Sequence, residues 1–483
     1  MSARLDAEVL VIGSGAGGAV TAATLAEAGF DVLVVEEGPW VEQGSVTPFS
    51  LAQMDLQYRA GGVTAALGVP TVAYTEGRCA GGGTEINSGL YRRPPGEIIE
   101  RWASRFRIAE FDADELDVLA DEVEKVLGIG PVPGGRWGEP SDRLRRGAAS
   151  LGWRHDESPR WMTYPDGGSA ADGRRQSMTR TYLPRARAAG ARIVTDCRVG
   201  RIEMRAGRAT WATYERTTDS GIERGEIHFR HVVVCGGAIQ TPAVLQRSGL
   251  HDRIGRSLAV HPTVKLTARF RDELNIPHDV PVHQVKEFAP ELSFGGSASH
   301  PGLVALSLLD NWAVHGHAVE SWRRIAVYYA AITSEGRGRV VAVPGLRDPL
   351  VTYRLTGRDK ALLRSGLGRL ALLMLHAGAS DVFPNFRGAP TVRTERDIAD
   401  LESRFAASRA SVMTVHLCST VPLGEDRTRC GADSFGRVHG TDNVHVNDAS
   451  LLPDAPGVNP QGSVMAIALR NARRFAAQES PRG

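Results

Sequence analysis

The chain has 483 residues, of which 42% are hydrophobic and 23% are charged, and its net charge is +2. These values are typical of a globular protein with a large core and more than one lobe. The small net charge argues against nucleic acid as a partner, so we expect the arginine clusters at 145–146 and 174–175 to be solvated surface.

The cysteines and the apolar runs set expectations about the compartment. Five cysteines without a Cys-x-x-Cys spacing predict neither a disulfide framework nor a metal site, which fits a reducing compartment. Strand-forming residues begin by Ala7, so no secretory leader is expected, and no apolar run approaches the length that spans a bilayer. We predict a cytoplasmic protein without a transmembrane segment and leave peripheral membrane contact open.

The first elements are predicted to be a strand, a glycine-rich turn, a helix and a second strand. The strand pattern covers 7–12, the small-residue helix covers 17–28, and the second strand covers 32–35 and is followed at once by Glu36. This order is typical of the start of a dinucleotide-binding site. A chance glycine-rich turn is the alternative.

Each residue of the Gly-x-Gly-x-x-Gly turn has a physical role in such a site. Gly13 permits the tight turn, Gly15 lets the backbone approach a pyrophosphate, and Gly18 lets the helix pack close to the strand. The phosphates then rest on the positive end of the helix. Glu36 would accept hydrogen bonds from the adenosine ribose. These residues alone do not distinguish FAD from NAD.

A second glycine-rich stretch covers residues 78–89 and contains three consecutive glycines followed by hydroxyl and amide side chains. The backbone N–H groups of such a loop can close on a flat ring or on a phosphate. We favour this interpretation over a flexible surface loop.

The middle of the chain predicts a return to the first sheet and then a separate lobe. Residues 231–245 read as a buried strand that enters a helix through a Gly-Gly turn. A strand is expected over 191–199 and a meander over 201–214. Short strands over 263–343 predict an antiparallel lobe. Residues 359–377 have apolar residues at helical spacing, which predicts a packed helix rather than a membrane anchor.

The C-terminal quarter contains the candidate chemistry. His416 could be a base or a satisfied core histidine. Asn459 and Pro460 precede a helix predicted to end near Ala476, and Asn459 could be a simple helix cap because Asn caps well and Pro is tolerated in the first turn. A strand is expected over 443–446.

Together these blocks resemble the glucose–methanol–choline family of flavin oxidoreductases. They lie in the family's order and span nearly the whole chain: the first glycine turn with Glu36, Gly82-Gly-Thr-x-Ile-Asn-Ser-Gly89, Gly236-Gly-Ala-Ile-Gln-Thr-Pro, and Asp448 to Gln461. The resemblance implies FAD rather than NAD. It also implies an α/β fold, with a Rossmann-like FAD-binding domain and a discontinuous substrate domain built on an antiparallel sheet.

The resemblance also gives a division of the chain. We assign 1–100, 175–262 and 425–483 to the FAD-binding domain, and 101–174 and 263–424 to the substrate-binding domain.

By position, His416 matches the family's active-site histidine and Asn459 matches its hydrogen-bonding partner. Oxidation of an alcohol to an aldehyde or ketone requires loss of the hydroxyl proton as hydride leaves carbon for the flavin N5. An imidazole that titrates near neutrality can be that base. Asn459 would orient the substrate oxygen without competing for its proton.

Other residues are implied to bind the cofactor. The helix that begins at Pro460 would aim free N–H groups, including that of Gln461, at the flavin pyrimidine edge. Asp448 and Ala449 resemble contacts to the ribityl and pyrophosphate part, and Val199 resembles an adenine contact. The second glycine stretch adds Gly82, Gly83, Asn87 and Ser88.

Two departures from the family pattern matter. Residues 419–424 read Ser-Thr-Val-Pro-Leu-Gly, where many members have Gly-Thr-Cys-Arg-Met-Gly. Ile86 stands where some members attach FAD to a histidine, so we predict noncovalent FAD unless another residue forms the bond.

The substrate is expected to be a small-molecule alcohol. Residues 254–262 and 359–377 resemble the long-chain alcohol oxidase branch, while sugars, aminosugars, polyols and sterols stay open. The electron acceptor, O2 or another carrier, stays open too. A hydroxynitrile lyase with non-redox FAD and a noncatalytic binding protein are the rival classes.

Overall fold

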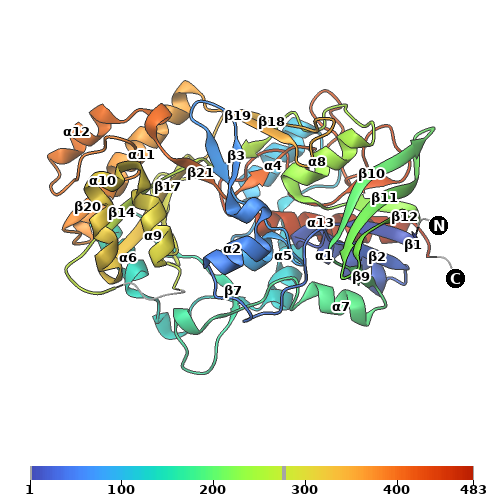
Figure 1. Ribbon diagram of the computed structural model, residues 1–483, viewed down its shortest axis with the longest axis horizontal. Helices are drawn as coiled ribbons and strands as arrows, with labels where there is room; N and C mark the ends of the chain where they lie inside the picture. Colours follow the sequence, from blue (N-terminus) through green and yellow to red (C-terminus); the bar gives the residue numbers. More distant parts are fainter. Residues whose placement is uncertain (1–2, 275–278, 482–483) are drawn as a thin grey trace.

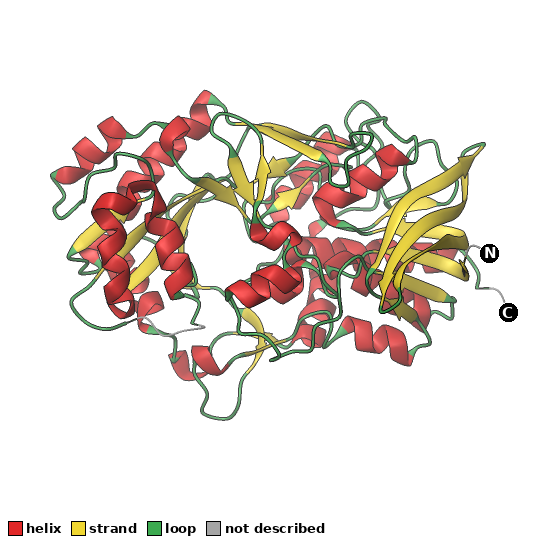
Figure 2. Cartoon of the chain, viewed as in Figure 1, coloured by secondary structure: helices red, strands yellow, loops and turns green. Residues whose placement is uncertain are grey.

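The computed structural model describes residues 3–274 and 279–481, which form two lobes side by side along the long axis of the molecule (Figures 1 and 2). The first lobe contains the first sheet and both ends of the described chain. The second lobe contains the second sheet and the helices α6 and α9 to α12. The mixed α/β fold, with a Rossmann-like domain and a substrate-domain sheet, is the predicted one.

The first sheet has a parallel core built from apolar strands. β1 (Ala3–Ile12) pairs with β2 (Val32–Val35) on one side and β12 (Gly221–Val234) on the other. β9 (Arg192–Val194) extends it beyond β2, and β23 (Val444–Val446) pairs with the last residues of β12. Strands buried on both faces read as continuous runs of Val, Ile and Leu.

Helices cover this sheet because parallel strands are joined by crossover connections, which place helices on the faces of the sheet. α1 (Ala16–Glu27) packs between α7 (Tyr182–Ala188) and α13 (Gln461–Gln478), and α13 also packs against α5 (Ala113–Leu127). α8 (Gly237–Arg247) follows β12, as the Gly-Gly turn predicts.

One predicted strand is divided in two. The expected strand over 191–199 is β9 followed by β10 (Cys197–Arg205), with Asp196 between them at φ 54°. A left-handed residue turns the chain, so β10 leaves the parallel core. It forms the predicted meander with β11 (Arg208–Thr218) and β12.

The second sheet is almost entirely antiparallel, as predicted. Its order is β3-β4-β21-β14-β17-β16-β15-β6, and β20 also pairs with β14. The single parallel pair among its described strands is β4 with β21. The strands are β3 Thr64–Ala66, β4 Val72–Tyr74, β6 His155–Glu157, β14 Thr263–Arg269, β15 His283–Val285, β16 Leu292–Gly296, β17 Ile325–Ile332, β20 Asp381–Pro384 and β21 Val412–Thr414.

The chain crosses between the two lobes more often than the predicted division into domains implies. β3 and β4 lie inside the predicted FAD segment 1–100, yet they pair within the second sheet. The antiparallel pair of β13 (Ala259–Val260) with β22 (Leu417–Cys418) joins segments that the division assigns to different domains.

The apolar helix predicted over 359–377 is α11 (Gly357–His376), which packs on β14 and β17. It begins with a capping box between Thr356 and Asp359, and it buries Leu363, Leu367 and Leu370. It is therefore a packed helix. Within residues 3–274 and 279–481, no helix has the length and apolar character to cross a membrane.

The shorter elements complete the two lobes. The helices are α2 Leu51–Gln57, α3 Gly83–Ile86, α4 Gly96–Phe106, α6 Glu139–Ser150, α9 Pro301–Leu308, α10 Trp312–His315 and α12 Asp397–Arg404. The strands are β5 Ile129–Gly130, β7 Arg160–Thr163, β8 Arg174–Arg175, β18 Arg337–Val341 and β19 Leu350–Arg354.

Candidate functional site

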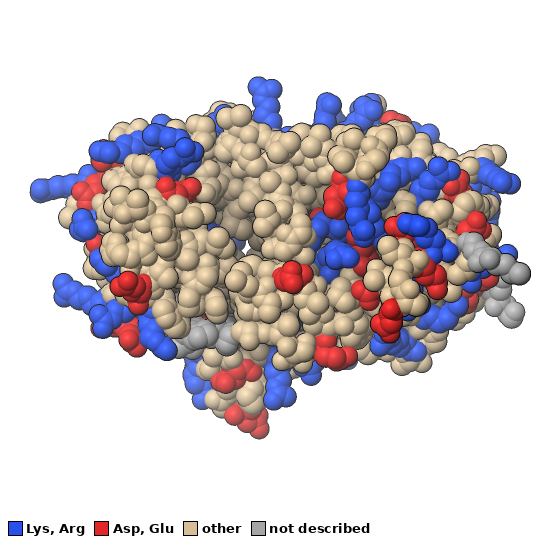
Figure 3. Space-filling model, in the orientation of Figure 1, with Lys and Arg blue, Asp and Glu red and all other residues tan. Residues whose placement is uncertain are grey.

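A cavity of about 530 Å³ lies between the lobes. Its walls are the ends of the parallel strands, the two glycine-rich loops, the start of α13 and one face of the second sheet. The space-filling view shows a hollow between the lobes, surrounded mostly by uncharged side chains (Figure 3).

The first glycine turn has the geometry that its sequence requires. A Cβ atom on Gly13 (φ 100°) would lie 2.4 Å from the carbonyl oxygen of Cys235, and one on Gly18 would lie 2.0 Å from that of Gly13. A Cβ on Gly15 would meet no atom within 4 Å. Gly13 and Gly18 are therefore needed by the fold, whereas Gly15 leaves open space at the start of α1.

Gly18→Ala is expected to destabilise the protein. The added methyl group collides with backbone that has no room to move, and such overpacking costs about 1–3 kcal/mol or more. Urea unfolding of the purified variant should show a lower midpoint than the wild type. An unchanged midpoint would contradict the close packing at this turn.

The second glycine stretch packs on the first rather than moving freely. The N–H of Gly81 donates to Oγ of Ser14 at 3.1 Å. A Cβ on Gly82 (φ 54°) would lie 3.0 Å from Cα of Gly15, while Gly83 faces open space. The surface-loop alternative is therefore wrong, and the two loops form one continuous wall of the cavity.

Glu36 is buried at the end of β2 and lines the cavity. One of its carboxylate oxygens accepts from the N–H of Ser14 (3.0 Å) and from its hydroxyl (2.7 Å), and the other accepts from the N–H of Gly38 (2.9 Å). Burial raises its pKa, and these donors oppose the rise. The carboxylate is fixed where a ribose would lie in a Rossmann site.

The remaining predicted cofactor residues border the same cavity. Val199 is on β10, and Asp448 and Ala449 follow β23. The Asp448 carboxylate also has a structural role, because it accepts from the N–H groups of Gly237 (2.7 Å) and Ser450 (2.8 Å). Asp448 thereby ties the start of α8 to the turn after β23.

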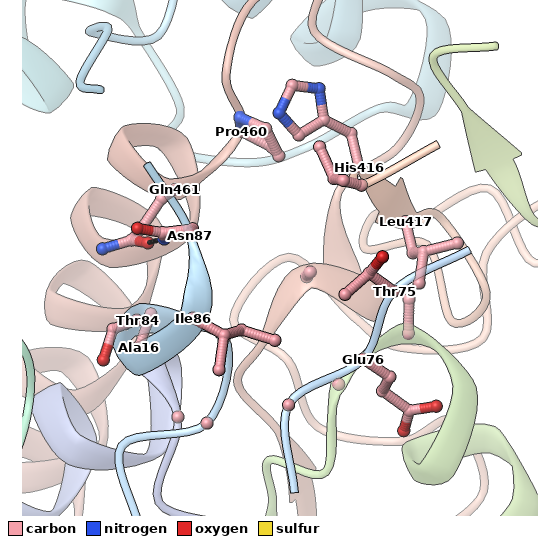
Figure 4. Close-up of a pocket in the computed structure, with 18 of the residues that line it drawn as sticks. Ala16, Thr75, Glu76, Thr84, Ile86, Asn87, His416, Leu417, Pro460 and Gln461 are labelled. Atoms are coloured by element: carbon pink, nitrogen blue, oxygen red, sulfur yellow. Dashed lines mark hydrogen bonds between the residues drawn. The ribbon is translucent and has the colours of Figure 1, made fainter. Parts of the chain in front are cut away.

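Asn87 links the second glycine stretch to the start of α13. Its Nδ2 donates to Oε1 of Gln461 at 2.9 Å, and Figure 4 shows this pair opposite His416, with Ile86 pointing into the space between. The Oδ1 of Asn87 accepts from the Arg175 guanidinium at 3.2 Å. Arg175 is thus not the solvated surface residue predicted. Pro460 and Ser88 also line the cavity.

His416 lies on the cavity wall, where the pairing of β13 with β22 positions it. Ala259 pairs with Cys418 and Val260 with Leu417, so His261 and His416 are the next pair along. Their Nδ1 atoms are 2.9 Å apart. Sequence reasoning missed His261, although it lies within the segment 254–262 that resembles the long-chain alcohol oxidase branch.

The hydrogen bonds around the two imidazoles have a direction. The N–H of Gly457 donates to Nε2 of His261 at 3.1 Å. A neutral His261 therefore carries its proton on Nδ1 and donates it to Nδ1 of His416. In this form His416 carries its own proton on Nε2, so Nδ2 of Asn459, which lies 3.4 Å from that atom, donates to it only in the opposite tautomer.

Asn459 is not the helix cap that was considered as an alternative. Pro460 occupies the cap position of α13, and no side chain caps that helix. The carboxamide of Asn459 instead lies between His416 and Gln284, whose Nε2 is 3.3 Å from Oδ1 of Asn459. Nε2 of Gln284 is also 3.4 Å from the hydroxyl of Tyr329. The structure brings His416 and Asn459 together, as predicted.

The second sheet contributes cavity residues that the sequence analysis did not identify. Lys265, Gln284, Lys286 and Tyr329 line it from β14, from β15 and the residue that follows it, and from β17. Period-2 alternation shows which residues share a face, but it does not show which face borders a cavity.

These features fit a bound dinucleotide. Gly15 leaves open space at the start of a helix that can hold a pyrophosphate, and an acidic residue is fixed at the end of β2. The start of α13 faces the same cavity beside His416 and Asn459. Fold and site together define a dinucleotide-dependent enzyme with a second lobe for substrate.

Comparison with known proteins gives the family. The GMC oxidoreductase profiles match residues 54–263 and 335–468, and a NAD(P)-binding Rossmann-like profile matches residues 11–41. The chain belongs to the GMC oxidoreductase family, which is FAD-dependent.

Three relatives illustrate the range of similarity. The uncharacterized GMC-type oxidoreductase y4nJ of Sinorhizobium fredii is 38% identical, over 99% of this chain and 96% of its own length. The long-chain-alcohol oxidase FAO4A of Arabidopsis thaliana is 25% identical, over 96% of this chain and 68% of its own. The crystal structure of pyridoxine 4-oxidase from Mesorbium loti has a TM-score of 0.74 at 20% identity, and the match covers 98% of this chain and 100% of that one.

Proposed function

We propose that the protein oxidises an alcohol to an aldehyde or ketone, with His416 as the base that removes the hydroxyl proton. The observation that carries this proposal is an imidazole on the cavity wall, paired with His261 and Asn459 and facing the start of α13. Bound FAD would accept the hydride at N5.

The environment of His416 keeps it neutral. Burial lowers its pKa to about 4, and the charge of Lys286 contributes to the lowering. A base must be unprotonated at the working pH, so a low pKa favours the competent form at neutrality. It also weakens the base, which must then be positioned well against the hydroxyl.

Acceptance of a proton at Nε2 requires the pair of imidazoles to reverse its polarity. His416 must carry its own proton on Nδ1 and donate it to Nδ1 of His261. The contact at 2.9 Å serves either direction, but the N–H of Gly457 then loses its acceptor. An unpaired buried N–H costs about 1–3 kcal/mol, less than or comparable to the ~2.7–5.5 kcal/mol that a positioned base supplies.

Asn459 holds the substrate oxygen beside His416. Its carboxamide is backed by Gln284, and Gln284 is near Tyr329. A side chain fixed from behind presents the same donor or acceptor to each substrate molecule, which is the basis of catalysis by orientation.

The activity should persist to low pH. Because the folded-state pKa of His416 is lowered from 6.5 to about 4, the neutral base dominates above that value and is lost as the pH falls through it. The rate of flavin reduction at saturating alcohol is therefore expected to be flat from about pH 7 to about pH 5. A fall centred near 6.5 would contradict the assigned environment of His416.

We infer noncovalent FAD because Ile86 has no nucleophilic atom, and we infer the two-domain division with residues 64–74 transferred to the substrate domain. Similarity to a long-chain-alcohol oxidase supports a bulky alcohol. A cytoplasmic location stays a prediction.

The experiment is anaerobic addition of alcohols to the purified yellow protein. Bleaching of the flavin band by a long-chain alcohol, a sugar, an aminosugar, a polyol or a sterol supports hydride transfer and identifies the substrate class. If no alcohol bleaches the band and a cyanohydrin releases cyanide, the rival lyase function is favoured.

A further inference from the structure

Two lysines project into the cavity from one face of the second sheet. Lys265 is on β14, and Lys286 directly follows β15. The strand register gives their positions: Lys265 pairs with Tyr329, which pairs with Gly295, and Gly295 pairs with Gln284. Lys286 is two residues beyond Gln284, so it lies in the next row of the same face.

Lys286 is the lysine near the base. It lies two residues beyond Gln284 on the same face, and Nε2 of Gln284 is 3.3 Å from Oδ1 of Asn459, the residue that contacts His416 at 3.4 Å. Its charge also lowers the pKa of both His416 and His261. Lys265 lies three strands away, about 14 Å across the sheet at the usual strand spacing. The two lysines therefore flank the floor of the cavity beside the reacting position.

Neither lysine has an ion-pair partner among the described residues. The acidic residues that line the cavity in the described chain already have donors. Asp448 and Glu36 are held by backbone N–H groups and hydroxyls, and Glu37 and Glu76 pair with Arg59 at 2.8 and 3.1 Å.

Asp156, the acidic residue whose charge acts on Lys286, is itself held by Arg92 at 2.9 Å. It is on β6, at the edge of the sheet, and it does not line the cavity. The positive charge on the cavity floor is thus not compensated by the described part of the chain.

An unpaired ammonium group in such a place is costly. Charged groups that leave bulk water are normally paired with an opposite charge, because the free-energy cost of their desolvation is otherwise not offset. Burial lowers the pKa of both lysines to about 8, which leaves both mostly protonated at neutral pH. Methionine of similar length would fill the same space without this cost, so the charges require an explanation other than packing.

We propose that the substrate is an alcohol that bears an anionic oxygen group, such as a carboxylate, which Lys286 binds beside His416 while Lys265 adds to the positive potential. This proposal rests on the proposed alcohol oxidation. It extends the proposal of a long-chain alcohol, because the anionic group of a hydroxy acid would pair with the lysines. The apolar body of such a substrate would contact the uncharged side chains around the cavity mouth.

The test compares matched acids and esters on the wild-type holoprotein without oxygen. The pairs are 4-(hydroxymethyl)benzoate with its methyl ester and 12-hydroxydodecanoate with its methyl ester. In at least one pair, the acid at limiting concentration should bleach the flavin about 10–100-fold faster than its ester does. This is the range expected for a charge-assisted hydrogen bond. Preference for the ester in both pairs would overturn the proposal.

The variants Lys286→Met and Lys265→Met should keep the fold, because each removes an unpaired charge from a partly buried position. Lys286→Met should abolish the preference for the acid over its ester, and Lys265→Met should weaken this preference less. Lys360→Met, at an exposed position of α11, is the matched control and should leave this preference unchanged. Equal loss for acid and ester in Lys286→Met would indicate a role other than anion binding and would also overturn the proposal.

Benzoate titration provides a readout that does not need turnover. Benzoate should perturb the flavin absorption spectrum of the wild type, and its Kd should rise about 10-fold or more in Lys286→Met. If no alcohol or acid bleaches the flavin but this binding pattern is found, the oxidation proposal fails and the anion site stands. If benzoate binds both proteins equally, or neither, the anion site fails.

Discussion

Replacement of His416 by alanine is expected to slow flavin reduction by about 10²–10⁴-fold, the contribution of a positioned general base. No free imidazole on that wall can then take the hydroxyl proton of the substrate, because Nε2 of the other nearby imidazole, His261, already accepts from the N–H of Gly457. Stopped-flow reduction by a saturating alcohol without oxygen measures this loss directly.

The control for this variant is His251→Ala, which removes an imidazole from an exposed position outside the cavity. It should reduce at the wild-type rate, and both variants should keep a full complement of FAD. If His416→Ala reduced at the wild-type rate while folded and yellow, His416 would not be the base.

Gly15→Val is expected to give a folded protein that is purified without its yellow colour. Its side chain would meet no protein atom near Cβ, and Gly15 has φ −66°, which any residue adopts. The new methyl groups instead fill the space where the pyrophosphate approaches the start of α1. FAD affinity should fall by about 100-fold or more, equivalent to about 2.7 kcal/mol.

Gly130→Val is the matched control for this second variant. A Cβ atom on Gly130 would likewise meet no atom within 4 Å, and Gly130 lies outside the cavity. The FAD content of this control should equal that of the wild type, and urea unfolding of the two apoproteins should give similar midpoints. A yellow Gly15→Val protein with normal FAD content would show that the pyrophosphate does not lie on this turn.

The sequence predicted those features that depend on local geometry. The roles of Gly13 and Gly18 follow from positive φ and close approach, which only glycine tolerates, and both contacts are present. α11 was predicted because its apolar residues repeat with the helical period. In the structure most of these residues are buried. The second sheet was predicted as antiparallel from its short strands, although the parallel pairing of β4 with β21 was not.

The features that the sequence did not predict depend on distant partners. His261 and His416 are 155 residues apart and meet because β13 pairs with β22. Asn459 has the sequence of a helix cap, but its carboxamide is held by Gln284, 175 residues away. The break at Asp196 is made by a non-glycine residue in the left-handed region, for which sequence composition gives little warning.

The central claim is that hydride leaves an alcohol carbon while His416 removes the hydroxyl proton. The most direct measurement is single-turnover reduction of the wild-type flavin, without oxygen, by the best alcohol of the panel and by the same alcohol deuterated at its carbinol carbon. We predict bleaching of the flavin band that is slower with the deuterated alcohol. An unchanged spectrum with every alcohol and hydroxy acid of the panel would contradict the account.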